Sequence, residues 1–378
     1  MSTVAEPSTP NPVRTTARLP FHTAVRTVFL LEMKQRLRGK AWYWMLGIWF
    51  VVIGFIFVLA TGVIGTTDNQ GGILFDLVVG FVLFFGLLVA PGLSANAVNG
   101  DRAGGTLAIL QVTLLTPGQL LAGKWLASWV GSLAFLLLSS PFIFWALALG
   151  GVDAREALVS LLMLAVELAV VCAIGVGVSA VAYRPLFSIV STYMLVALLA
   201  IGTLIVYGLS TQLVMEERTM TTSYYTYPDS SVDDMGVPDA NAELECVTQT
   251  NLSMVPRTEY ITWILSANPF VVVADAVPYN LEDYPDPEVP PGALTNGPYY
   301  TPGVMETISQ GVRASQAGPD DNQTCEESAQ LMQPLPQGTP IWPLGLGIQV
   351  LLAGALLLLG RRKLTMPAKR LAQGTRIA

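Results

Sequence analysis

The chain has 378 residues, of which 52% are hydrophobic and 12% charged, and its mean hydropathy is +0.53. Soluble globular domains carry about 25% charged residues. The composition therefore excludes a soluble globule of this length and predicts an integral membrane protein.

The net charge of −7 is unevenly distributed. Residues 215–340 contain 19 acidic residues but only Arg218, Arg257 and Arg313 as basic ones, a balance of −16, so the remainder of the chain sums to +9. We therefore expect one acidic, water-exposed region and basic segments that flank a membrane.

The first 41 residues predict a tail and an interfacial helix. Residues 1–20 are rich in Pro and Thr and lack the apolar core and cleavage site of a secretory signal, so we expect a disordered tail. Residues 21–41 predict an amphipathic helix in the membrane interface, or a juxtamembrane helix that binds anionic lipid nonspecifically. Its apolar stripe is Phe21, Val25, Phe29, Met33 and Leu37.

Six apolar runs are each long enough for the roughly 20 residues that a bilayer crossing needs. We expect five of them within residues 42–214 and a last one at 341–360, which makes an all-α polytopic membrane protein. The expected spans are residues 42–61, 73–98 (interrupted by Pro91 and Gly92), 119–149, 157–182, 186–210 and 341–360.

Charge predicts the orientation of these spans. With both termini inside, the inner segments hold 16 basic residues, including the tail at 361–378, and the outer segments hold four. This asymmetry is the positive-inside pattern, so we expect cytoplasmic termini and an extracellular region at residues 215–340.

Two carboxylates lie within the spans. Asp76 is about two turns from the outer end of its span, and we expect it to reach interfacial water. Glu167 is near the middle of its span and would cost about 2.5 kcal/mol or more if it faced lipid, so it should face protein or a water-filled path. A packing role for a neutral Glu167 and a role in a transport route both remain open.

The fourth span also carries Gly175, Gly177 and Ser179, and this small-residue face should pack closely on another helix. In the extracellular region we expect short strands and irregular loops around too little core for a β-sandwich. Residues 260–278 are apolar but broken at Asn268-Pro269.

The cysteines are unevenly placed. Cys246 and Cys325 both fall in the extracellular region, whereas Cys172 lies in a span. An oxidising compartment favours a disulfide between the outer pair.

Catalytic chemistry finds no support in the sequence. No GxxxxGK[ST] motif occurs, so the chain has no P-loop for ATP, and its single histidine, His22, excludes a His/Cys zinc cluster and a convincing Ser-His-Asp set. We expect no enzymatic activity, cofactor or metal in this chain, and no nucleic-acid partner.

The segment between the second and third spans is built as a hinge. Gly104 and Gly105 free the backbone, Thr106 can cap a short helix, and Thr116 to Gln119 form a capping box with proline at the first helical position. An ordinary helix-capping loop is the alternative.

This segment resembles the coupling helix of permease subunits in type-2 ABC exporters. The resemblance covers about 25 residues, from Asn99 to Gly123-Lys124, and implies a coupling helix at residues 100–117. It departs from the family in that Asp101 stands where the family usually has Glu, and proline is displaced from the position after Thr113 to Pro117. It implies contact with an ATPase through Asp101, Arg102, Gly105, Thr106, Leu107, Leu110 and Thr113.

The same resemblance implies the partners and the location. An exporter permease of this class pairs with an identical or homologous permease, and two separate ATPase subunits bind ATP and Mg²⁺. We expect such a complex among the lipids of a bacterial plasma membrane. The rival interpretation is a membrane-anchored scaffold or sensor whose extracellular region binds a ligand or an envelope component.

Overall fold

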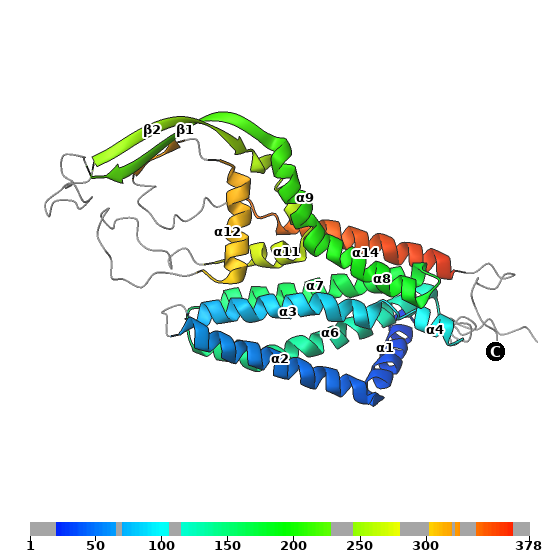
Figure 1. Ribbon diagram of the computed structural model, residues 1–378. Coiled ribbons are helices and arrows are strands. Elements are labelled where there is room, and N and C mark those ends of the chain that lie inside the picture. Colours follow the sequence, from blue (N-terminus) through cyan, green and yellow to red (C-terminus); the bar gives the residue numbers. More distant parts are fainter. Residues whose placement is uncertain are drawn as a thin grey trace, which may run out of the picture.

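The computed structural model describes residues 20–65, 70–105, 115–227, 245–279, 302–319, 322–325 and 338–365. The expected N-terminal tail at 1–20, apart from Pro20, and the C-terminal residues 366–378 lie outside these ranges. Figure 1 shows an elongated helical bundle, with a smaller strand-containing part at the end opposite the labelled C-terminus.

Six helical segments among the described residues are long and apolar enough to cross a membrane, which confirms the expected polytopic helical fold. They are α2 (Lys40–Ile64), α3 with α4 (Gln70–Ser94 and Asn99–Ala103), α6 (Pro117–Ala148), α7 (Ala154–Val181), α8 with α9 (Pro185–Ala197 and Thr203–Ser210) and α14 (Trp342–Leu364).

Two details of these spans differ from the sequence expectation. Helix α3 continues past Pro91 and ends at Ser94, so the interruption lies in the turn at residues 95–98 and not at the proline. Proline forfeits only its own backbone N–H, and the helix resumes its pattern when Ala95 donates to the Pro91 carbonyl at 2.8 Å. The fifth span contains a π-helical turn, Leu198–Gly202, between α8 and α9.

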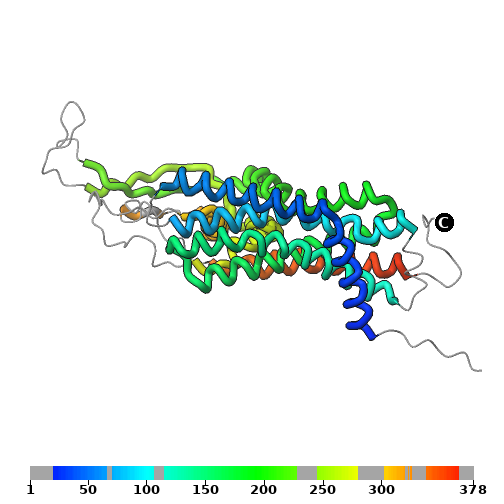
Figure 2. Tube along the Cα trace, turned by 90° about the horizontal axis from the view of Figure 1, so that it is seen from below, coloured from blue at the N-terminus to red at the C-terminus, as the bar shows by residue number. Residues whose placement is uncertain are grey.

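The axis of helix α1 (Phe21–Arg38) lies at a steep angle to the axes of the spans (Figures 1 and 2). Of the predicted apolar stripe, Val25 is buried, whereas Phe21 and Leu37 are exposed. The side that packs on the bundle is formed by Ala24, Val25 and Val28. The exposed apolar residues are then available to the membrane interface.

Helix α7 is the centre of the bundle, and its small residues face neighbouring helices as predicted. A β-carbon at Gly177 would lie 2.7 Å from Cβ of Leu356 on α14, and one at Gly175 would lie 2.0 Å from Oγ of Ser94 on α3. Side chains at these positions would separate the helices, because dispersion contacts in the membrane require close approach.

Between the fifth and sixth spans lies the insertion, residues 215–340. Strands β1 (Met215–Thr226) and β2 (Glu245–Pro256) pair antiparallel, with Met215 opposite Pro256 and Thr226 opposite Glu245, and the short β3 (Asn322–Gln323) runs parallel to β1. These 12-residue strands are longer than expected from the sequence. The ribbon curves away beyond the bundle, and α12 (Val304–Ala317) lies between it and the spans (Figure 1).

The apolar stretch at residues 260–278 divides as expected. It forms α10 (Trp263–Ser266) and α11 (Pro269–Ala276), and Asn268 caps α11 by accepting from the Phe270 N–H at 2.9 Å. The break therefore has a local cause, namely an Asx cap followed by proline at the first helical position.

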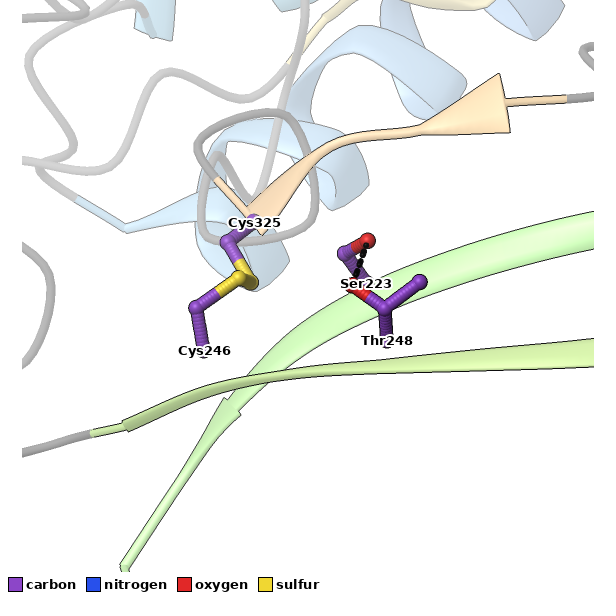
Figure 3. Close-up of a disulfide and its surroundings, with 4 residues drawn as sticks. All are labelled: Ser223, Cys246, Thr248 and Cys325. Carbon is purple, nitrogen blue, oxygen red and sulfur yellow. Dashed lines mark hydrogen bonds between the residues drawn. A yellow bond between two sulfur atoms is a disulfide. The ribbon is translucent and has the colours of Figure 1, made fainter.

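A disulfide joins Cys246 on β2 to Cys325, and Figure 3 shows it beside the Ser223–Thr248 hydrogen bond that links β1 and β2. The bond confirms the expected pairing. Because an isolated two-stranded ribbon is only marginally stable, a crosslink across 79 residues matters here. Chain entropy puts its contribution at about 4 to 5 kcal/mol.

We predict that Cys246→Ser and Cys325→Ser each destabilise the ribbon, and that the double variant is no worse than either single one, because each change removes the same bond. Hydrogen exchange of the β1 and β2 amides should rise while that of α7 stays unchanged. Two freely alkylated thiols in the native wild-type protein would contradict the bridge.

Candidate functional site

Three charged side chains meet at the end of the bundle where α1 lies, which we call the basic end. Lys124 on α6 is almost fully buried, and its amine contacts Glu32 of α1 and Asp101 of α4, the latter at 2.6 Å. We call these three residues the Lys124 cluster. It joins the interfacial helix, the start of the hinge segment and the third span in one electrostatic unit.

Local residues determine where α6 begins. Thr116 and Gln119 form the predicted capping box, with the Thr116 N–H donating to Oε1 of Gln119 at 2.8 Å and Pro117 at the first position. Gly123 then allows α1 to approach, because a β-carbon there would lie 2.6 Å from Cβ of Val28. Lys124 is thereby placed directly against the polar side of α1.

Arg36 adds a second fastening between α1 and the spans. Its guanidinium donates to the Leu93 carbonyl at 2.9 Å and to Oγ of Ser128 at 3.1 Å. Burial lowers the pKa of Arg36, and the negative charge of Glu32 opposes that shift. Helix α1 is therefore tied to both α3 and α6.

The other flank of the hinge is fixed on α7. Ser179 Oγ accepts from the backbone N–H groups of Val98 and Asn99 at 3.0 and 3.1 Å. Arg102 donates to Oδ1 of Asn99 at 2.7 Å and to the Ala182 carbonyl at the end of α7. Asp101 and Arg102 thus diverge, one toward α6 and the other toward α7.

The structure places only part of the predicted contact set. Asp101, Arg102 and Gly105, whose φ is +75°, stand at the base of the hinge. The remaining predicted contacts, Thr106, Leu107, Leu110 and Thr113, lie outside the described residues. Sequence reasoning missed the partners Glu32 and Arg36, although Glu32 is the sole acidic residue of the basic segment 21–41, which is a usable signal.

Glu167 lies within the bundle and is fully buried. Gln349 of α14 lies beside it, but within the described parts of the chain neither carboxylate oxygen has a hydrogen-bond partner, and the same holds for Oε1 of Gln349. A protonated Glu167 carries an O–H donor of the kind that an amide oxygen accepts. The side chain faces protein, as the cost of exposing it to lipid requires.

Asp76 is also buried, so the expectation that it reaches interfacial water is wrong. Its side chain is 4% exposed, and Oδ2 accepts from the Glu306 N–H at 2.9 Å, at the start of α12. The reason lies in the tertiary structure, because the insertion covers this end of α3 and presents a helix N-terminus with unsatisfied N–H groups.

A second carboxylate fastens the insertion to the last span. Oδ2 of Asp275 accepts from the N–H groups of Ile341 and Trp342 at 2.7 and 3.1 Å, at the start of α14. Its Oδ1 lies 3.4 Å from Nε of Arg313 on α12. Burial raises the pKa of Asp275, and the two N–H donors and Arg313 oppose the shift.

The Lys124 cluster generates a stability prediction. Lys124→Met should lower the free energy of unfolding by about 3 to 5 kcal/mol, because two carboxylates are left near each other without their cation. Glu32→Gln and Asp101→Asn should each cost less, since one carboxylate still pairs with Lys124. Thermal unfolding of the purified chain measures this order, and Lys34→Met on the exposed face of α1 serves as control. Equal effects of the Lys124 and Lys34 changes would contradict it.

For Glu167 we predict that Glu167→Gln keeps the fold and the ATP hydrolysis of a complex with its ATPase across the neutral pH range. The amide retains the shape and hydrogen bonding of a neutral carboxyl, so a packing role survives the change. Glu167→Ala, which removes the polar group and leaves a cavity, should lower the unfolding temperature. Lost activity in a folded Gln variant would instead assign the charge a role in transport.

Comparison with protein families gives a match over residues 26–364 to the family described as ABC-2 family transporter protein. A search of curated proteins gives no match. The match covers most of the chain, including all six candidate spans and the insertion. The chain therefore belongs to the ABC-2 transporter family, as its non-catalytic, multi-pass transmembrane permease subunit.

Proposed function

We propose that this permease forms the translocation path of an ATP-driven exporter as a dimer, with one separate ATPase subunit docked on each hinge segment. The observation that carries the proposal is the Lys124 cluster. It connects the base of the segment that resembles a coupling helix to the interfacial helix and to the third span.

A displacement of the hinge can be transmitted through two sets of contacts. On one side it reaches α6 and α1 through Asp101, Lys124 and Glu32. On the other it reaches the end of α7 through Arg102 and the Ala182 carbonyl. Contiguous ion pairs and hydrogen bonds between rigid helices are the kind of network that transmits a displacement.

The orientation follows from charge. The basic end carries the Lys124 cluster, the base of the hinge and the basic last turn of α14, so the proposal places it in the cytoplasm, where ATP is available, with the insertion outside. The disulfide in the insertion agrees with that placement, because such bonds persist in oxidising compartments.

The dimer surface is proposed on the least buried spans. Helix α2 and the part of α8 beyond Val190 expose large apolar side chains, among them Val51 and Phe55 on α2 and Met194 on α8. Helix α7, by contrast, is enclosed by its own chain. A path between two permeases therefore runs along the peripheral spans, which favours a packing role for Glu167 on α7.

The test of ATPase docking replaces two leucines of the hinge. Leu107→Asp with Leu110→Asp should abolish recovery of the ATPase in a pull-down while membrane insertion persists, because two charges are placed in an apolar contact. Leu213→Asp with Leu252→Asp, at exposed leucines of the insertion end, is the matched control.

A second readout separates docking from coupling. Asp101→Asn should leave the ATPase bound but reduce the response of its hydrolysis rate to the permease, since the link to Lys124 is weakened. Unchanged ATPase recovery with the leucine variant would overturn the docking proposal. An unchanged rate with Asp101→Asn would overturn the transmission route alone.

A further inference from the structure

A cavity of about 750 Å³ opens at the basic end, where the last turn of α7, the turn into α8 and the end of α14 meet. Its volume is that of a pocket for a small amphiphile. Its lining includes Tyr183, Arg184, Leu186, Phe187, Val190 and Lys363.

The cavity is apolar along its walls and cationic at one end. Leu186, Phe187 and Val190 on α8 are exposed and form one wall. At the end nearest the α7–α8 turn stand Arg184 and Lys363. A ligand that matches both parts carries a negatively charged head and an apolar tail.

The ring of Tyr183 lies against two cations at this end of the cavity. The amine of Lys363 lies 4.9 Å from the centre of the Tyr183 ring and donates to the Val181 carbonyl at 3.2 Å. On the same ring, the guanidinium carbon of buried Arg102 lies 5.7 Å from the centre. Both contacts are within cation–π range, so they hold the two cations close together.

Among the described residues, no carboxylate compensates this charge. No salt bridge is formed there by Arg102, Arg184 or Lys363. Asp101, which precedes Arg102 in the chain, pairs with Lys124. In addition, the 13-residue helix α8 begins at the cavity without a side-chain cap on its N-terminus. Pro185 at the first position has no N–H, but the free N–H groups that follow it and the positive dipole end favour an anion at the same place.

We propose that this cavity binds an anionic phospholipid of the leaflet at the basic end, with the phosphate against Arg184, Lys363 and the α8 N-terminus and an acyl chain along Leu186 to Val190. Basic pockets between spanning helices on the cytoplasmic side have the chemistry that recognises anionic headgroups. The inference rests on the orientation given in the proposed function. Through Tyr183 and Arg102, the bound lipid adjoins the base of the hinge.

A second permease copy fits this cavity less well than a lipid does. A protein partner would have to bring acidic side chains to the cations, whereas the described basic end carries few: Glu32 and Asp101 are engaged by Lys124. An anionic lipid brings its charge and its apolar tail together.

The test uses the purified full chain in a neutral detergent and native mass spectrometry with phosphatidylglycerol and with phosphatidylcholine of the same acyl chains. Arg184→Gln with Lys363→Gln removes two cations from the cavity. Arg26→Gln with Lys34→Gln removes two exposed cations from α1 at the same end and is the matched control. Each cation near a lipid surface contributes about a fivefold factor, so loss of two cations should make the cavity variant bind phosphatidylglycerol roughly 25-fold more weakly.

We expect wild-type protein and the α1 control to prefer phosphatidylglycerol, and the cavity variant to lose that preference. Equal losses in both variants would overturn the proposal in favour of nonspecific interfacial charge. Displacement of the lipid by millimolar inorganic phosphate would also overturn it, because the site would then recognise a free anion.

A photoactivatable phosphatidylglycerol provides a measurement on the unaltered chain. Lipid adducts should map to residues 183–190. Adducts confined to α1 would overturn the proposal even if the cavity variant fails to fold. The ATPase pull-down is independent of this readout. Failure of lipid binding and failure of ATPase docking are therefore distinguishable.

Discussion

A buried ammonium group is stable only where carboxylates replace its water, and Lys124 depends on two of them. Because Glu32 and Asp101 come from different elements, neutralising the lysine also decides how α1 and the hinge sit against α6. Gly123 is part of the same arrangement, since only a residue without a β-carbon lets Val28 approach so closely. Electrostatics and packing thus specify one geometry at the basic end.

The insertion end follows the same rule with carboxylates and helix N-termini. Asp76 receives an N–H group of α12, and Asp275 receives two from α14 while it pairs with Arg313. Helix α12 is therefore held by α3 at its start and, through Asp275, by the last span. The disulfide at Cys246 and Cys325 keeps the ribbon itself in place.

Much of the fold is readable from the chain because a bilayer imposes strict local rules. Apolar runs of sufficient length predicted the six spans, and the Thr116 capping box and the Asn268-Pro269 break appear as expected. Pairing of Cys246 with Cys325 was predicted because both lie in the region expected in an oxidising compartment, whereas Cys172 lies in a span. The long β1–β2 ribbon was missed, because strand length depends on pairing between segments that local sequence does not specify.

The candidate site was only partly predictable. By itself the sequence determined membrane insertion, the number of candidate spans, the charge asymmetry and the capping box at Thr116, since each depends on composition or short-range spacing. Only the tertiary structure decided that Asp101 meets Lys124 and Glu32, that Asp76 is covered by α12, and that Glu167 faces Gln349. Those outcomes depend on which helices become neighbours, and local spacing along the chain does not specify contacts between segments far apart in the sequence.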